Sequence, residues 1–185
     1  MFRLLQKLVD RITTRYSLAL MAILDMVFMF FLVPAVYGQF MNGGQLCKTL
    51  DTLFMYTPEA AREVLACLGP LLGRYRLVEL TLDLVYPVVY SLFLSMVLTA
   101  LLRNTPLEQK LLRYLPLLPI LAWLSDLLEN LGIVTMISLY PEIPRPLAAA
   151  ASLCTSMKWV FVGLSVASSI IFSVYKLMIK CKPQL

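Results

Sequence analysis

The chain has 185 residues, of which 60% are hydrophobic and only 15% are charged, and its mean hydropathy is +0.81. Soluble domains carry about a quarter charged residues, so this composition excludes an ordinary soluble domain and indicates a membrane protein. The net charge of +5 does not indicate nucleic-acid binding, because the basic residues flank apolar segments and no basic–aromatic groove pattern is present.

The residue inventory also limits the chemistry. Histidine is absent, which removes the commonest general base and the commonest metal ligand. The four cysteines, Cys47, Cys67, Cys154 and Cys181, have neither the C-x-x-C nor a zinc-ligand spacing. We therefore predict no metal and no cofactor, and any acid–base chemistry falls to Asp, Glu, Tyr, Lys or Cys.

The N-terminal segment, 1–15, has a basic residue every four positions with leucine and isoleucine between them. This spacing predicts a short basic amphipathic helix, which either lies on an anionic membrane surface or serves only as a flank that sets topology. The first predicted span follows at Tyr16–Tyr37. It is too long for a signal-peptide core, and Pro34 is expected to kink or end it.

The region 38–73 is the only long stretch without a predicted span. Thr57-Pro58-Glu59 is typical of a helix start and Gly69-Pro70 of a helix stop. We expect a short amphipathic helix at about 58–68, in the first extracytoplasmic loop. Cys47 and Cys67 lie in the same region, and the sequence is compatible with both a disulfide and two free thiols.

The second predicted span covers Leu80–Leu102. A polar stripe with helical spacing enters it from the preceding segment, and its members are Arg76, Glu79, Asp83, Tyr86 and Tyr90. Pro87 cannot donate to the carbonyl of Asp83, four residues earlier. That carbonyl must find a hydroxyl, a water or a neighbouring helix.

The third predicted span, Leu115–Tyr140, contains Asp126, Glu129 and Asn130 on one helical face. Each charge at bilayer depth costs roughly 2.5–3.5 kcal/mol on insertion scales. These groups therefore need polar partners or a functional role. The fourth predicted span, Ala148–Ile179, carries Lys158 and Trp159. It also has many small residues, which allow close approach of another helix.

The distribution of lysine and arginine predicts the topology. Ten lie on the flanks that would be inside and five on the outer segments, with Lys158 within a span. The predicted fold is all-α, a single domain over 1–185 that forms an integral membrane four-helix transmembrane bundle. Both termini are expected in the cytoplasm, and the membrane is a plasma or bacterial inner membrane or that of an organelle.

This topology brings four polar side chains to one depth in the outer half of the bundle: Asp83, Glu129, Asn130 and Lys158. Four aromatic side chains could line this polar layer: Tyr86, Tyr90, Trp123 and Trp159. Four carboxyl groups in the spans, Asp25, Asp83, Asp126 and Glu129, outnumber the one lysine. Surplus carboxylates must be protonated, hydrated or bound to a cation.

The leading hypothesis is an intramembrane polar pocket that binds, and possibly transforms, a lipid-like or hydrophobic molecule. Glu129 or Asp83 would then be the acid or base. The residues expected to contact the ligand are Tyr86, Tyr90, Asp126, Asn130, Lys158 and Trp159. Whether the protein is an enzyme stays open.

Two alternatives remain. The polar layer is a structural clamp in a non-catalytic accessory subunit, or the protein is a proton- or ion-coupled carrier, although it lacks the usual internal repeat. Besides membrane lipids, a protein partner or a second copy could bind the small-residue face of the fourth span.

Overall fold

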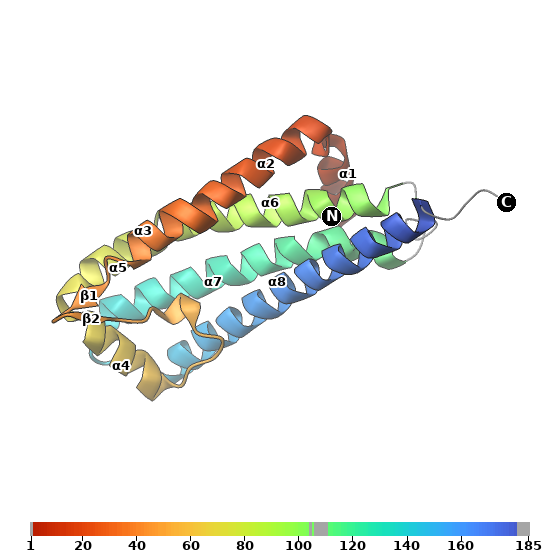
Figure 1. The fold of residues 1–185 in the computed structure, drawn as a ribbon. Helices are drawn as coiled ribbons and strands as arrows, with labels where there is room; N and C mark the ends of the chain where they lie inside the picture. The colour runs from red at the N-terminus through yellow and green to blue at the C-terminus, as the bar shows by residue number, and fades with distance from the viewer. Residues whose placement is uncertain (1, 104, 106–110, 181–185) are drawn as a thin grey trace.

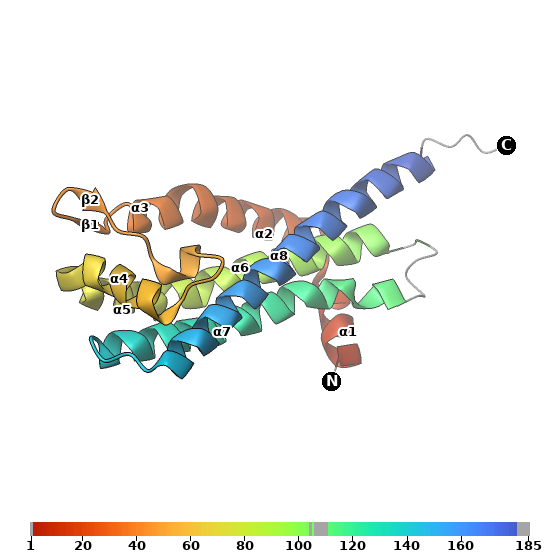
Figure 2. The same cartoon turned by 90° about the horizontal axis from the view of Figure 1, so that it is seen from below.

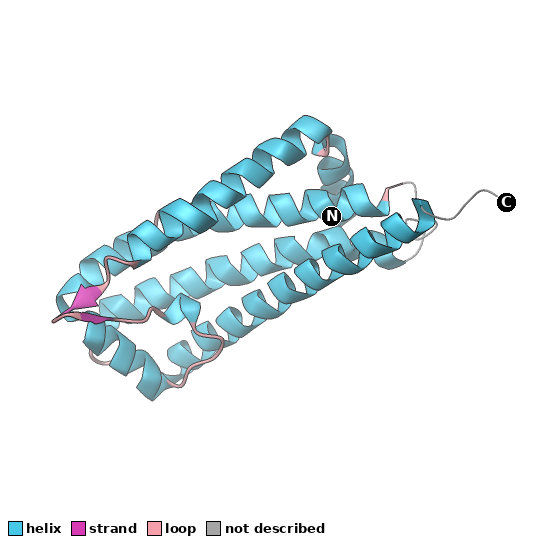
Figure 3. Cartoon of the chain, in the orientation of Figure 1, coloured by secondary structure: helices cyan, strands magenta, loops and turns pink. Residues whose placement is uncertain are grey.

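The computed structural model describes residues 2–103, 105 and 111–180. Apart from a short hairpin, β1 (Met41–Asn42) and β2 (Gln45–Leu46), and the connecting loops, the described chain is helical (Figures 1 and 3). Four helical segments are long and apolar enough to cross a membrane: Arg15–Tyr37, Leu82–Leu102, Leu112–Leu139 and Arg145–Ile179.

The four long segments run along the length of the molecule in Figure 1. They are centred on α2 (Arg15–Val27), α6 (Leu82–Leu102), α7 (Leu118–Leu139) and α8 (Arg145–Lys180). The most extensive packing joins α7 to α8, and α6 contacts all three others. In the described part of the chain α2 packs mainly on α6 and has no extensive contact with α8. Figure 2 shows α8 crossing α6 and α7 obliquely.

The first long helix is irregular. Its regular part gives way to a π-helical stretch, η1 (Phe28–Leu32), and then to α3 (Val33–Tyr37), which contains Pro34. Pro34 was expected to kink or end the helix. The helix does not end there but continues to Tyr37, because a π turn rearranges the backbone hydrogen bonds just where the proline has no N–H to offer.

The segment between the first two long helices folds over one end of the bundle. It contains the hairpin, the 3₁₀ turns η2 (Leu50–Thr52) and η3 (Gly69–Leu71), α4 (Pro58–Leu68) and α5 (Leu72–Glu79). Thr57 caps α4 by accepting from the N–H of Ala60. The main apolar core lies here and joins this segment to α7 and α8, through residues such as Phe40, Leu65, Tyr75, Met136 and Ala148.

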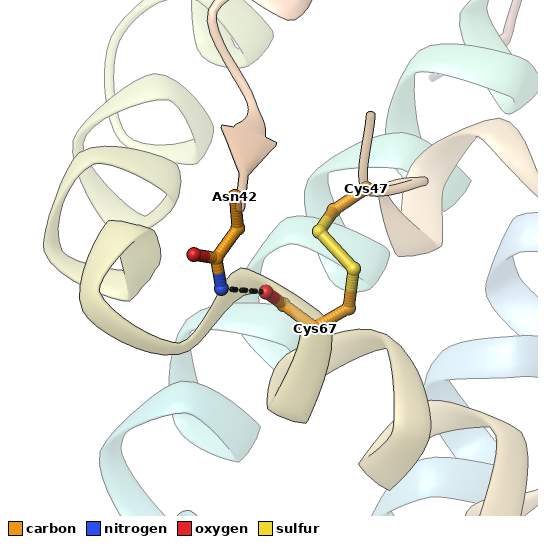
Figure 4. Close-up of a disulfide and its surroundings, with 3 residues drawn as sticks. All are labelled: Asn42, Cys47 and Cys67. Atoms are coloured by element: carbon orange, nitrogen blue, oxygen red, sulfur yellow. Dashed lines mark hydrogen bonds between the residues drawn. A yellow bond between two sulfur atoms is a disulfide. The ribbon is translucent and has the colours of Figure 1, made fainter. Parts of the chain in front are cut away.

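A disulfide holds this end segment together. Cys47 is bonded to Cys67, and the Asn42 side chain donates a 2.7 Å hydrogen bond to the Cys67 carbonyl (Figure 4). The sequence alone left a disulfide and free thiols as alternatives. The bond closes a loop with a sequence separation of 20, so the segment between the two cysteines is covalently tied to the end of α4.

The helix that was expected to carry the whole polar stripe is broken. Its N-terminal part is α5, and the chain leaves helical geometry at Leu80–Thr81 before α6 begins. The break turns Arg76 outward, where it is exposed. The predicted stripe is therefore wrong for Arg76, while Asp83, Tyr86 and Tyr90 stay together on α6.

Two shorter elements lie at the other end. The N-terminal helix α1 (Phe2–Ile12) is held there by an ion pair of 2.6 Å between Arg103 and Asp10. A 3₁₀ stretch, η4 (Leu111–Leu117), precedes α7, and most of the chain between Arg103 and Leu111 lies outside the described residues.

The closest approach between α7 and α8 depends on Gly132. A Cβ atom at this position would stand only 2.7 Å from the Cβ of Ala151, which has no rotamer through which to move away. By contrast, a Cβ at Gly163 of α8 would meet nothing within 4 Å.

We predict that Gly132→Ala destabilises the protein by about 1 kcal/mol, because overpacking outweighs the gain in helix propensity. Gly163→Ala, the matched control, should leave stability unchanged or raise it. Thermal unfolding of both variants in detergent measures the difference. Equal melting temperatures would contradict the close approach.

Candidate functional site

Lys158 is a buried cation at the junction of three segments. Its Nζ forms ion pairs with Glu129 Oε2 at 2.5 Å and Asp126 Oδ1 at 3.2 Å, both on α7. It also donates to the backbone carbonyl of Asp51, at 3.4 Å. Thr155, one turn before Lys158 on α8, donates to Glu129 Oε1 at 2.9 Å. The lysine thus joins α8 to α7 and to η2.

The backbone gap at Pro87 is filled by the neighbouring helix. The Asn130 side chain on α7 donates a 2.8 Å hydrogen bond to the carbonyl of Asp83, the group that the proline leaves without its helical donor. Asn130 is 2% exposed, and its amide nitrogen serves this carbonyl.

A tyrosine hydroxyl joins two carboxyl groups beside this point. The Tyr37 hydroxyl lies 2.6 Å from Asp51 Oδ2 and 2.7 Å from Asp83 Oδ2. A phenol has one proton to donate. It satisfies one carboxylate at a time, so the second short contact requires a proton on a carboxyl group or a cation nearby.

Glu79 completes a cluster of three acids. Oxygen atoms of Asp51, Glu79 and Asp83 lie within 4.8 Å of one another. Glu79 is fully buried, and neither of its carboxyl oxygens has a hydrogen-bond partner in the described chain. Burial, followed by the negative charges of Asp51, Asp83 and Glu129, raises the pKa of Glu79 well above its usual range.

Tyr75 borders this cluster on α5. Its hydroxyl donates to Asp51 Oδ1 at 3.2 Å and accepts from the N–H of Leu50 at 3.0 Å. Burial and the negative charges of Glu79 and Asp51 raise the pKa of Tyr75 well above its usual value, so the tyrosine remains a neutral donor.

A cavity of about 470 Å³ lies next to these groups. The first long helix lines one side, α8 lines the other, and α6 supplies most of the wall between them. Its polar side chains are Asp25, Tyr37, Asp51, Thr52, Asp83, Tyr86, Tyr90, Asp126 and Lys158. Apolar side chains make up the rest, among them Met29, Val33, Leu94, Val162 and Val166.

The aromatic groups of the cavity contact one another. Tyr86 stacks on Phe28 of the first long helix with ring centroids 5.4 Å apart, and Tyr90 meets Tyr86 edge to face. The Tyr90 hydroxyl donates to Asp126 Oδ2 at 3.0 Å. Lys158 Nζ lies 5.6 Å from the ring centroid of Trp159.

The predicted site residues therefore divide into two groups. Six of them line the cavity: Asp83, Tyr86, Tyr90, Asp126, Lys158 and Trp159. Glu129 and Asn130 do not, since Glu129 is fully buried against Lys158 and Thr155 and Asn130 faces the Asp83 carbonyl. Trp123, expected as a wall, is not among the lining residues either.

Sequence reasoning missed Asp51 and Tyr37 as site residues and left Glu79 without a role. Asp51 lies in a 3₁₀ turn with no periodicity to reveal it, and Tyr37 marked only the end of a predicted span. Glu79 was placed on the polar stripe, but its proximity to Asp51 is a tertiary contact that the spacing of the stripe does not encode. The position of Tyr37 could have indicated its role, because the hydroxyl of a tyrosine at a helix end can hydrogen-bond to a nearby carboxyl group.

The small residues of α8 were expected to face a partner. Several of them pack within the chain instead: Ala148 and Ala151 are buried in the main core. Ser152 accepts from the Tyr56 N–H and Ser156 donates to the Phe54 carbonyl. Gly163 is exposed, so the part of this face still open to a partner lies further along α8.

Comparisons with protein-family models, with curated proteins and with solved structures found no match. The site offers a set of carboxyl groups as acceptors, one lysine already paired with two of them, and an apolar wall. Among the described residues, the oxygen atoms that could hold a metal ion are those of Asp51, Glu79 and Asp83.

The pairing between Asn130 and Pro87 gives a testable prediction. Asn130→Leu leaves the Asp83 carbonyl without a donor and should cost about 1–2 kcal/mol of stability. In a Pro87→Ala background residue 87 regains its N–H, so the same Asn130→Leu change should cost clearly less. A double-mutant cycle from thermal or denaturant unfolding in detergent measures this coupling. Equal costs in both backgrounds would contradict it.

Proposed function

We propose that the protein is an integral membrane protein with four spanning helices, and that its cavity binds a lipid-like molecule. Apolar side chains on the outside of the long helices support the first part, among them Phe31, Leu131, Ile170 and Leu177, each more than 60% exposed. Surfaces of this kind are stable only against lipid or another apolar partner. The excess of basic residues on α1 and at the end of α8 supports cytoplasmic termini.

The disulfide agrees with this orientation. Disulfides persist in oxidising compartments, and Cys47 and Cys67 lie in the end segment that this topology puts outside. The acid cluster and the polar part of the cavity are at the same end, so the proposed ligand site belongs to the outer half of the bundle.

The observation that carries the binding proposal is the composition of the cavity. One part presents Asp51, Asp83 and Lys158, and the other presents aliphatic side chains. At its edges Met29, Trp159 and Val166 are 54%, 42% and 41% exposed, which supports an opening between the first long helix and α8. The volume of about 470 Å³ is in the range of small-molecule sites.

These features favour an amphipathic ligand. A hydroxyl or amine head group would donate to the carboxyl oxygens, and an apolar part would lie along Leu94, Val162 and Val166 toward the lipid. If the ligand is transformed, Asp83 is the candidate acid or base, because Glu129 does not reach the cavity. Tyr86 and Tyr90 supply an aromatic face to the bound molecule.

Filling the cavity tests this proposal. Val162→Trp puts a large ring into the cavity, whereas Val160→Trp adds the same ring at an exposed position of α8, outside the lining. Native mass spectrometry with lipid analysis of the purified proteins should find a bound molecule in the unmodified chain and in Val160→Trp. The amount of bound molecule per chain should fall by about tenfold or more in Val162→Trp.

Two results would contradict the proposal. One is the absence of any co-purifying molecule from the unmodified protein. The other is equal retention in Val160→Trp and Val162→Trp at equal thermal stability, which would mean that the bound lipid lies elsewhere on the surface.

A second candidate function is a structural clamp in a non-catalytic subunit. The observation that favours it is the buried contact of Lys158 with Glu129, Asp126 and the Asp51 carbonyl. Such a contact fixes the register of α8 against α7 and η2, since each polar group would be costly without the others.

The clamp makes its own prediction. Lys158→Met leaves two buried carboxylates without a counter-charge and should cost roughly 3–5 kcal/mol. The triple variant Lys158→Met, Asp126→Asn, Glu129→Gln should recover most of that loss, because the amides need no counter-charge. Lys176→Met, which removes a lysine that donates to the Ala100 carbonyl, is the control. Thermal unfolding in detergent measures all three variants, and equal losses in Lys158→Met and Lys176→Met would refute the clamp.

A further inference from the structure

We propose that Asp51, Glu79 and Asp83 together bind a calcium ion, which ties η2 to α5 and α6 at the outer end of the bundle. The sequence predicts no metal site, because histidine is absent and the cysteines lack a ligand spacing. A site built only from carboxyl oxygens needs neither residue type.

The spacing of the oxygen atoms fits one ion. Calcium binds oxygen ligands at about 2.3–2.6 Å, so two ligands on opposite sides of it lie roughly 4.6–5.2 Å apart. One oxygen from each of Asp51, Glu79 and Asp83 lies within 4.8 Å of the other two. The three groups are therefore close enough together to share a single calcium ion.

Glu79 supplies independent evidence that something is bound. It is fully buried, it points into the cluster, and neither of its oxygens has a hydrogen-bond partner among the described residues. A buried carboxyl group without a partner is costly. The Tyr37 hydroxyl donates to Asp51 or Asp83, whereas the Tyr75 hydroxyl beside Glu79 donates to Asp51 instead.

Charge balance points the same way. In the described chain no lysine or arginine forms an ion pair with Asp51, Glu79 or Asp83. Lys158, the nearest cation, is paired with Asp126 and Glu129 and reaches only the backbone carbonyl of Asp51. A divalent ion would offset most of the charge of three neighbouring carboxylates.

The ligand chemistry selects calcium among the divalent ions. Carboxylate oxygens suit magnesium, calcium and manganese, while zinc and copper favour nitrogen and sulfur. Magnesium keeps several of its waters and demands octahedral geometry. Calcium instead takes six to eight oxygen ligands in flexible geometry, and waters from the adjoining cavity can complete its shell beside Asp51 and Asp83. The outer location also matches extracellular calcium modules, which bind at about 10⁻⁴–10⁻³ M.

The experiment uses the full chain, purified in detergent and treated with a chelator. Calcium binding is measured by equilibrium dialysis, and thermal unfolding is followed as calcium chloride or magnesium chloride is added. We expect saturable binding of one calcium per chain with a dissociation constant near the millimolar range. The melting temperature should rise over the same concentrations, and magnesium should have a much smaller effect.

Glu79→Gln should weaken calcium binding by at least tenfold and abolish the calcium-dependent rise in melting temperature. Glu63→Gln, on the exposed face of α4, is the matched control and should behave like the unmodified protein. If Glu79→Gln fails to fold, Asp51→Asn measured by the same dialysis takes its place. Absence of calcium binding in the unmodified protein, or unchanged binding in the cluster variant, would overturn the proposal.

This inference can fail separately from the proposed function. Glu79 does not line the cavity, and Val162 belongs to its apolar lining. Val162→Trp should therefore lose the lipid-like ligand but bind calcium normally, whereas Glu79→Gln should lose calcium but retain the ligand.

Discussion

The arrangement of the bundle depends on keeping a lysine charged in a buried position. Lys158 satisfies this constraint with Glu129 and Asp126 on α7 and with the carbonyl of Asp51 in η2. Because these partners come from different segments, they define how α7, α8 and the end segment meet. The close approach at Gly132 and Ala151 belongs to the same interface, so one helix pair carries both the tightest packing and the strongest charge interaction.

The cavity and the acid cluster share Asp51 and Asp83 but differ in what surrounds them. On the cavity side these groups meet open space and aliphatic side chains. On the other side they meet the buried carboxyl group of Glu79 and the hydroxyl of Tyr75. Neutralising the cluster would reduce the negative charge that faces the cavity, so the two proposed sites are expected to influence one another electrostatically.

The four long apolar helices could be predicted from the sequence, because their length and hydropathy are properties of composition alone. Sequence reasoning also identified the gap at Pro87, since a missing N–H is a local covalent fact. It could not choose the partners of Lys158, because these depend on how α8 is rotated against α7. Asp51 and Tyr37 were missed for a similar reason: a tertiary contact across the end of the bundle gives them their role, and no periodicity records it.

The π-helical stretch at Phe28–Leu32 has a consequence for the first long helix, which has no fully buried residues of its own. In a regular α-helix, side chains nine positions apart point in opposite directions, because each residue turns by about 100°. Phe28 and Tyr37 are nine positions apart, yet both reach α6, one by stacking on Tyr86 and the other through Asp83. The wider turn takes up about one extra residue, which rotates Tyr37 back toward α6. Deleting a single residue within this turn would therefore keep the helix apolar and long, while swinging its anchoring hydroxyl away from the acids.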